Sequence, residues 1–578
     1  MSQGMIRIQP GMAASEYNAL VTRGIADRAA PRIMKRGASV FTADSALRKL
    51  IANRLGWVDV AAKMKRQIPA IERFGNEVIR SGIKHVVLVG MGGSSLCPEL
   101  FKFMFGKHRK LTSFDVLDST DPAGILNLQK KLNLKKTLFI IASKSGGTVE
   151  TRSHEAYFLD KVAQIGVQVP GRQFVAITDK GSSLEVFAKE HKYRKIFLNP
   201  PDIGGRYSAL SYFGLVPGFF AGVQLRRLLE NAIAMEKLVR ERNDESNPAL
   251  VLAASITAAA QTGRDKLTCL VTSSWAPLIP WIEQLVAEST GKQGRGIVPI
   301  EAEPLGTVDS YGDDRAFLFI RSAGEKSRTS SSLRKQLIER KSPVADITLV
   351  DRSDLGGQFI LWEAATALIG YSLGINPFDE PNVTESKENT KKILAGFKLI
   401  GDSSANRGDK SGEQLTLLAL DEATPHDFGS DHDVRAVLRQ FLSGIKAPHY
   451  VATISYTASN SGTEREMAKL RSLLRDRLGV ATLRGYGPRF LHSIGQLYKG
   501  GVPNGHFIVF VRGDYGQLRI PGQSFGFGQL ICAQALGDTQ ALARRKLPAL
   551  MISINGPVTS GLRAFREMVS SLLQQEGK

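Results

Sequence analysis

The sequence predicts an α/β protein that contains doubly wound parallel sheets and ends in a further α/β block. Short apolar, β-branched runs alternate with helical patterns from residue 83 to about 235, and a second alternating set follows to about 398. Two of the early runs end in glycine- and hydroxyl-rich turns, at 90–95 and 143–148, and each turn leads into an apolar helix. A third set of strand and helix patterns occupies residues 446–578. We therefore expect two sheets of similar plan and a third, partial α/β layer.

The segments follow one another in a simple order. Residues 1–82 carry helical spacing without strand runs, which predicts a helical lead-in. The first sheet domain is expected at 83–235, with strands near 86–89, 113–117, 138–141, 174–177 and 195–198. The second is expected at 236–398, with strands near 267–272, 317–320 and 347–350. A polar, glycine-rich linker or insertion is predicted at 399–445, before the C-terminal block.

The composition is that of an ordinary globular protein. Hydrophobic residues make up 43% and charged residues 23% of the 578 residues, and no apolar run reaches the roughly 18 residues of a membrane span. The first residues lack the apolar core of a signal peptide, and the three cysteines are too widely spaced for a metal or disulfide pattern. We expect a cytoplasmic protein without metal, cofactor or membrane attachment.

The formal net charge of +21 allows two interpretations. Nucleic-acid binding would gather basic residues on one helix or arm with a recognition motif, but here they are spread along the chain. A basic field that attracts phosphorylated small molecules explains the charge better, so no nucleic-acid partner is expected.

The two hydroxyl-rich turns are suited to binding an anion. Backbone N–H groups at a helix N-terminus have no helical partner, and the helix dipole adds partial positive charge there. Four side chains can add hydroxyl hydrogen bonds, namely Ser94, Ser143, Ser145 and Thr148. Neither turn has the spacing of a Walker loop or of a dinucleotide fingerprint. The sequence therefore favours a phosphorylated small molecule over a nucleotide.

Together with three further motifs, these turns resemble the phosphoglucose isomerase family, which is built from two sugar-isomerase (SIS) domains. The first turn resembles its first phosphate loop and the second turn its second. Residues 204–208 (Gly-Gly-Arg-Tyr-Ser) resemble its arginine loop, 284–292 its catalytic glutamate segment, and 383–387 its catalytic lysine segment. Five motifs in family order make this a specific resemblance.

The resemblance implies a metal-independent aldose–ketose isomerase that interconverts glucose 6-phosphate and fructose 6-phosphate through a cis-enediolate. Glu288 would move the proton between C1 and C2, Arg206 would stabilise the enediolate, and Lys387 would assist ring opening. The phosphate would be held by the four hydroxyls named above, with Gly93 and Lys144 beside them, and Gln284 would bind sugar hydroxyls. A carboxylate base and a guanidinium are chemically sufficient for this proton transfer.

The chain departs from the short bacterial members of the family in two respects. Their catalytic histidine lies in a Leu-His-Ser-x-Gly-Gln motif before the lysine, whereas here the matching motif is 491–496, beyond Lys387. We therefore hypothesise that His492, supplied by the C-terminal block of the same chain or of a dimer mate, is the ring-opening acid and base. The second departure is the extension itself, which looks like the isomerase part of bifunctional transaldolase/phosphoglucose isomerase proteins.

The sequence is also compatible with other functions. A regulatory protein could keep the phosphate loops without catalysis, and a dual phosphoglucose/phosphomannose isomerase would share the same residues. A lone glutamate or lysine on a helix is usually solvated, and hydroxyl-rich turns are often helix caps. Retention of Glu288, Lys387 and Arg206 favours the isomerase, because binding alone needs no carbon-acid base. The resemblance also implies a homodimer.

Overall fold

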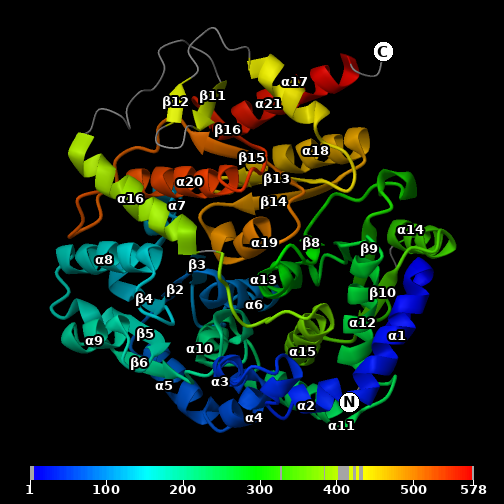
Figure 1. Ribbon diagram of the computed structural model, residues 1–578. Helices are drawn as coiled ribbons and strands as arrows, with labels where there is room; N and C mark the ends of the chain where they lie inside the picture. The colour runs from blue at the N-terminus through cyan, green and yellow to red at the C-terminus, as the bar shows by residue number, and fades with distance from the viewer. Residues whose placement is uncertain are drawn as a thin grey trace. The chain divides into compact units, whose positions relative to one another are not determined.

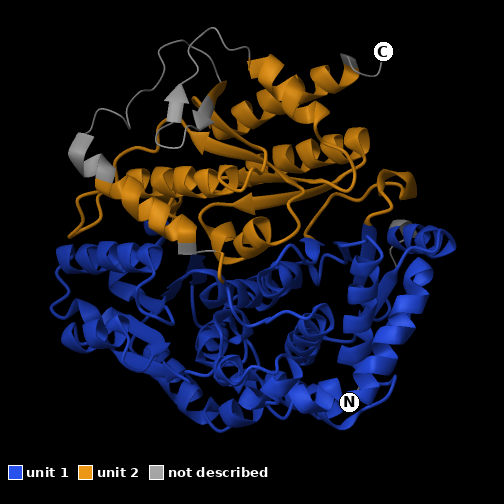
Figure 2. Ribbon diagram, in the orientation of Figure 1, with its two compact units in different colours: residues 1–118, 129–299, 315–380 blue, residues 119–128, 300–314, 381–578 orange. Residues whose placement is uncertain are grey.

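The chain folds into two compact units (Figure 2). The computed structural model describes residues 5–325, 328–382, 384–400, 415–420, 425–427 and 434–575. The first unit comprises residues 1–118, 129–299 and 315–380, and the second comprises residues 119–128, 300–314 and 381–578. The segment boundaries expected at 82, 235, 398 and 445 stay predictions.

The first sheet of the first unit has five parallel strands in the order β3-β2-β4-β5-β6 (Figure 1). They span His85–Gly90 (β2), Ser113–Leu117 (β3), Thr137–Ala142 (β4), Phe174–Asp179 (β5) and Lys195–Asn199 (β6). Every residue of β2 and β4 is buried, as expected for central strands of a parallel sheet with helices on both faces. The five predicted strands are confirmed.

The strand order reverses between β2 and β4. In a doubly wound sheet, ligands bind at the carboxyl ends of the two strands that flank such a reversal. The register pairs Gly90 with Ala142, the last residues of β2 and β4, so the turns that follow the two strands begin at the same level. These turns are the two hydroxyl-rich turns identified in the sequence.

The second sheet of the first unit has the order β1-β10-β9-β7-β8. Its strands span Met5–Gln9 (β1), Lys266–Val271 (β7), Val298–Ile300 (β8), Arg315–Ser322 (β9) and Val344–Leu349 (β10). Strands β7, β9 and β10 are parallel, as predicted. The expectation that residues 1–82 contain no strand is wrong, because β1 pairs antiparallel with β10. Ile6 and Ile8 pack on the core, but this alternation was too short to be recognised in the sequence.

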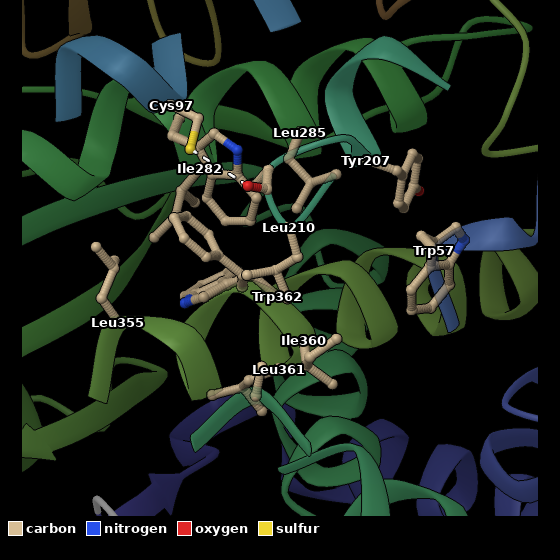
Figure 3. Close-up of a cluster of buried hydrophobic side chains, with 14 of the residues drawn as sticks. Trp57, Cys97, Tyr207, Leu210, Ile282, Leu285, Leu355, Ile360, Leu361 and Trp362 are labelled. Atoms are coloured by element: carbon tan, nitrogen blue, oxygen red, sulfur yellow. Dashed lines mark hydrogen bonds between the residues drawn. The ribbon is translucent and has the colours of Figure 1, made fainter. Parts of the chain in front are cut away.

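One hydrophobic core joins the elements of the first unit. Figure 3 shows part of it, where Trp57 stacks on Tyr207 with ring centroids 5.4 Å apart and α15 contributes Trp362. This core supports the backbone on both sides of Arg206.

The α-helices of this unit are α1 (Ala14–Ala26), α2 (Ala29–Ile33), α3 (Ser45–Ala52), α4 (Val60–Lys65), α5 (Ile68–Arg80), α6 (Leu96–Phe105), α8 (Val149–Gln164), α9 (Ser183–Glu190), α10 (Tyr212–Ala221), α11 (Leu225–Glu241), α12 (Pro248–Gln261), α13 (Ile279–Thr290), α14 (Arg328–Glu339) and α15 (Leu355–Leu373).

The second unit contains a six-stranded sheet of order β12-β11-β16-β15-β13-β14. The strands span Leu415–Leu420 (β11), Pro425–Asp427 (β12), Tyr450–Ser455 (β13), Ala481–Tyr486 (β14), Gly505–Arg512 (β15) and Ala549–Ile554 (β16). Its helices are α16 (Thr384–Ile400), α17 (Val434–Ser443), α18 (Ser461–Leu478), α19 (Gly495–Gly500), α20 (Phe527–Ala543) and α21 (Val558–Gln575); α7 (Pro122–Lys131) begins in this unit. The four strands β13 to β16 are parallel, which confirms the predicted C-terminal α/β block.

Part of the expected linker at 399–445 is regular structure. Strand β11 pairs antiparallel with β16, and α17 contributes Leu438 and Leu442 to the core of the second unit. Residues 401–414, 421–424 and 428–433 of that segment lie outside the described residues. Among the residues that are described, no helix has the length and apolar character needed to cross a membrane.

Candidate active site

The second hydroxyl-rich turn is organised by its own side chains. Ser143, at the end of β4, lies 3.1 Å from the Thr148 hydroxyl, and its Oγ accepts a hydrogen bond from the Gly146 N–H at 3.2 Å. Gly146 has φ = +75°, a conformation that favours glycine, and it lets the chain fold back over Ser143. Ser145 is exposed and its Oγ accepts from the Gly147 N–H at 3.4 Å. The turn therefore gathers the hydroxyls of Ser143, Ser145 and Thr148 just ahead of α8.

Lys144 lies in the same turn but is already paired. Its ammonium donates to Asp179 Oδ2 at 2.5 Å and to the Pro201 carbonyl at 3.0 Å. The ion pair ties the turn after β4 to the end of β5, the next strand of the sheet. Lys144 thus supports the turn and adds positive charge next to Ser143.

The first turn packs directly against the arginine loop. A Cβ placed on Gly93 would lie 2.3 Å from the Gly205 carbonyl oxygen, so only glycine permits this approach. Ser208 donates to the Gly205 carbonyl at 2.7 Å and holds the arginine loop in a tight turn. Ser94 is half-buried beside this contact. The fold therefore brings the first phosphate-binding candidate and Arg206 together, although they are more than a hundred residues apart in the chain.

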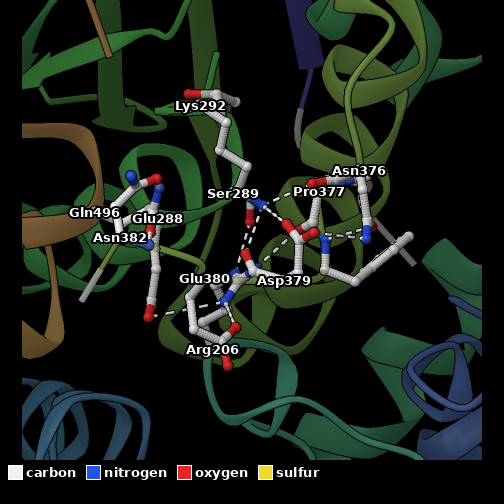
Figure 4. A network of polar contacts seen from close by, with 12 residues as sticks. Arg206, Glu288, Ser289, Lys292, Asn376, Pro377, Asp379, Glu380, Asn382 and Gln496 are labelled. Carbon is white, nitrogen blue, oxygen red and sulfur yellow. Dashed lines mark hydrogen bonds and ion pairs between the residues drawn. The ribbon is translucent and has the colours of Figure 1, made fainter. Parts of the chain in front are cut away.

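Arg206 is the centre of a buried polar network (Figure 4). Its side chain is 3% exposed. The guanidinium donates to Ser289 Oγ at 2.8 Å, to Glu380 Oε2 at 3.0 Å and to the carbonyls of Pro377 and Asp379 at 2.8 and 3.0 Å. Burial acts to lower the pKa of Arg206, but the carboxylates of Glu288 and Glu380 outweigh it and raise that pKa. The cation is therefore fixed in place and permanently charged.

Glu288 lies on the last turn of α13, with Gln284 one turn before it on the same face. Glu288 Oε1 is 3.8 Å from Arg206 Nη1, and the Glu288 side chain is 13% exposed. Gln284 is buried, with 3% exposure. A largely buried carboxylate next to a fixed guanidinium can accept a proton from carbon while the cation stabilises the oxyanion that forms.

Lys292 belongs to the same network, and sequence reasoning missed its role. Its ammonium donates to Asp379 Oδ1 at 2.6 Å, to the Asn376 carbonyl at 2.6 Å and to the Asp379 carbonyl. Burial and the nearby Arg206 guanidinium lower the pKa of Lys292 to about 8, against the opposing effect of Asp379. Arg206 and Lys292 thus both bind the same short loop, residues 376–380.

Glu380 was also missed. It stands in the stretch 377–381, Pro-Phe-Asp-Glu-Pro, which from the sequence suggested only an extended turn. In the structure its carboxylate is the nearest charged partner of Arg206, closer than Glu288. Two sequence features lie next to the missed residues: the proline-flanked turn around Glu380 and the Ser-Thr-Gly-Lys that follows Glu288. Neither feature identifies a partner of Arg206.

Lys387 and His492 belong to the second unit. Lys387 is an exposed residue in the first turn of α16. His492 is half-buried and ends a short 3-10 turn, Arg489–His492, just before α19.

The described residues hold no group of three or more His, Cys, Asp or Glu side chains placed to bind a metal ion.

The comparisons with known proteins give a family match for part of the chain. Residues 49–299 match the family model of phosphoglucose isomerase. The matched span contains both hydroxyl-rich turns, Arg206, Gln284 and Glu288, whereas Lys387 and His492 lie beyond it.

Relatives of known name extend the similarity along the chain. A glucose-6-phosphate isomerase of Prochlorococcus marinus (strain NATL2A) is 27% identical over 438 residues, which cover 68% of this chain and 81% of the relative. One of Mycoplasmopsis pulmonis (strain UAB CTIP) is 28% identical over 389 residues, covering 59% of this chain and 90% of the relative.

Two solved structures share the fold. A hypothetical protein from Thermus thermophilus has a TM-score of 0.57 at 24% identity, covering 69% of this chain and all of that one. A glucose-6-phosphate isomerase from Chlamydia trachomatis has a TM-score of 0.50 at 20% identity, covering 64% of this chain and 78% of that one.

Proposed function

We propose that this protein is a glucose-6-phosphate isomerase of the phosphoglucose isomerase family, an aldose–ketose isomerase that works through a cis-enediolate. The observation that carries the proposal is the carboxylate of Glu288 held 3.8 Å from the buried guanidinium of Arg206. Binding a sugar phosphate needs neither group in this arrangement, so a regulatory protein without catalysis is not favoured. The relatives named above carry this activity in their names.

Each group has a role in the proposed reaction. The hydroxyls of Ser94, Ser143, Ser145 and Thr148 and the backbone donors of both turns hold the phosphate, with Gly93 and Lys144 supporting them. Gln284 binds sugar hydroxyls. Glu288 removes the proton from C2 of the aldose and returns it to C1, and Arg206 stabilises the negative charge on the enediolate oxygen between the two steps.

Ring opening is assigned to the second unit in this proposal. Lys387 and His492 are the groups that move a proton between the ring oxygen and the anomeric hydroxyl. No step requires a metal or an organic cofactor. We further propose that the protein acts in glycolysis and gluconeogenesis as a homodimer in the cytoplasm, as the family resemblance implies.

The test is a coupled assay that follows glucose 6-phosphate formed from fructose 6-phosphate in the presence of EDTA. Glu288→Gln keeps the size of the side chain but removes the base, and we expect kcat to fall by about a thousandfold. Binding of fructose 6-phosphate, measured by calorimetry, should survive. Glu283→Gln is the matched control on another face of α13 and should leave kcat within about threefold.

Glu380→Gln distinguishes the two carboxylates that contact Arg206. The amide oxygen of glutamine can still accept from the guanidinium, so we expect kcat to fall by about tenfold or less. A larger loss for Glu380→Gln than for Glu288→Gln would transfer the base role to Glu380. Absence of turnover in the unmodified protein, with binding retained, would contradict the proposed function itself.

A further inference from the structure

The helix that follows His492 is bonded to the segment that carries Lys387. Gln496 of α19 accepts a hydrogen bond from the Asn382 N–H at 2.8 Å and donates one to Asn382 Oδ1 at 2.7 Å (both residues are labelled in Figure 4). One turn later, Lys499 Nζ donates to Ser386 Oγ at 2.5 Å. The residues on either side of the start of α16 are thus held by a single short helix.

Lys499 has a buried side chain that pairs with a buried carboxylate. Its side chain is 0% exposed and lies 3.2 Å from Asp538 Oδ1 on α20, whose side chain is 3% exposed. The second oxygen of Asp538 accepts a hydrogen bond from the Tyr456 hydroxyl at 2.6 Å. A buried ion pair adds little stability compared with apolar packing, but it fixes the geometry of the groups it joins. A methionine would fill the same space, so the ammonium at this position points to a positional role.

The buried face of α16 is held along α20 as well (Figure 1). A Cβ on Gly537 would lie 3.1 Å from the Thr390 backbone nitrogen, so the two helices approach closely at this glycine. Arg545 pairs with Glu385 and also donates to the Lys499 carbonyl at 3.0 Å. Ser386 and Thr390 are therefore buried while Lys387, on the other face of the same turn, stays exposed.

We propose that Lys499 is a positioning residue for the ring-opening step. Lys499 links the turn that carries Lys387 to the helix that begins three residues after His492. The hydrogen bonds of Gln496 to Asn382 strengthen this link. The segments that carry the two candidate ring-opening groups are therefore linked within the second unit. The inference rests on the proposed function, because it assigns the ion pair to the geometry of that reaction.

Ser386→Ala is the first test, because it removes the acceptor of Lys499 and leaves the Lys499–Asp538 pair intact. We expect kcat for fructose 6-phosphate to fall by about tenfold with KM within about twofold, the scale of one hydrogen bond to a charged group. Ser386→Thr keeps the hydroxyl and should restore kcat. Lys499→Met should lower kcat further, and Lys469→Met, which removes a half-exposed lysine paired with Glu466, should not change it.

A double-mutant cycle separates positioning from general damage. If the Ser386 hydroxyl acts by placing Lys387, Ser386→Ala will have no further effect on kcat in a Lys387→Ala protein. Full, independent losses in the two backgrounds would overturn the inference, as would an unchanged kcat in Ser386→Ala. A second readout needs no activity: amide hydrogen exchange over 384–390 should accelerate in Ser386→Ala and Lys499→Met but not in Lys469→Met. If the unmodified protein lacks isomerase activity, the proposed function fails. Separately, unchanged hydrogen exchange in the variants would show that the contact between Lys499 and Ser386 does not stabilise the start of α16.

Discussion

Replacing Arg206 with lysine keeps a positive charge next to Glu288 but removes the planar fork of donors. Arg206 serves four acceptors, the Ser289 hydroxyl, a Glu380 oxygen and the carbonyls of Pro377 and Asp379, all within 3.0 Å. A lysine ammonium is a compact charge on a flexible stem and cannot reproduce this geometry. At least two of the four acceptors should lose their donor in Arg206→Lys.

The magnitude follows from the two buried acceptors, the Ser289 hydroxyl and the Pro377 carbonyl, because the Glu380 side chain is 40% exposed. A buried acceptor left without its partner costs about 1–3 kcal/mol, so two of them should lower the free energy of unfolding by about 3 kcal/mol. Catalysis should fall in addition to stability, because the donor that stabilises the oxyanion also moves. Loss of one such donor lowers kcat by about 10²–10³. We expect Arg206→Lys to lose about a hundredfold in kcat.

The assay combines urea unfolding with isomerase turnover at a temperature where both proteins are folded. Arg471→Lys is the matched control. Arg471 is 1% exposed and donates to three backbone carbonyls of the second unit, those of Glu301, Ala302 and Thr482, at 2.6–2.8 Å. Arg471→Lys should lose comparable stability without loss of kcat in the folded protein.

Two results would refute the reasoning. If Arg206→Lys keeps kcat within about threefold of the unmodified protein, the guanidinium does not stabilise the intermediate. If Arg206→Lys and Arg471→Lys lose kcat in proportion to stability, the effect is a general consequence of weakened packing. Only loss of kcat confined to Arg206→Lys supports its catalytic role.

Two further predictions concern the turn at Gly93 and the response to acid. Gly93→Ala should raise KM for fructose 6-phosphate several-fold, because its methyl group would meet the Gly205 carbonyl at 2.3 Å and push the two loops apart; an unchanged KM would show that this contact does not shape the phosphate site. Burial and the neighbouring His449 lower the pKa of His506 to about 4 from its ordinary 6.5, so His506 takes up its proton in the unfolded chain before it does in the folded one. The free energy of unfolding should therefore fall as the pH is lowered from about 6.5 to 4, and His506→Phe should reduce this dependence in urea titrations; an undiminished dependence would assign it to other groups.

Continuous apolar runs made the parallel strands predictable. β2 and β4 are buried at every position, so their sequences are apolar after the first residues, His85 and Thr137, and the turns after them are rich in glycine and hydroxyl residues. These are local properties, because a buried strand and the turn that ends it are specified within about ten residues. The short edge strand β1 was missed for the same reason, since five residues with two isoleucines carry little local information.

The partners of the candidate catalytic groups could not be predicted in this way. Arg206 and Glu288 were identified by motif, but Glu380 and Lys292 were not, because neither stands in a pattern that names a partner. Arg206 contacts Ser289, 83 residues away, and Glu380, 174 residues away. Such pairs depend on how the helices and loops pack, which no local pattern records.

The same distinction applies to the second unit. The sequence by itself determined that the C-terminal block is an α/β structure and singled out the motifs of Lys387 and His492. Only the tertiary structure showed that Gln496 and Lys499 bond to the segment at the start of α16, 113 or more residues earlier in the chain. Secondary structure follows from short-range preferences, whereas the position of a reactive side chain follows from long-range packing that brings distant segments to one place.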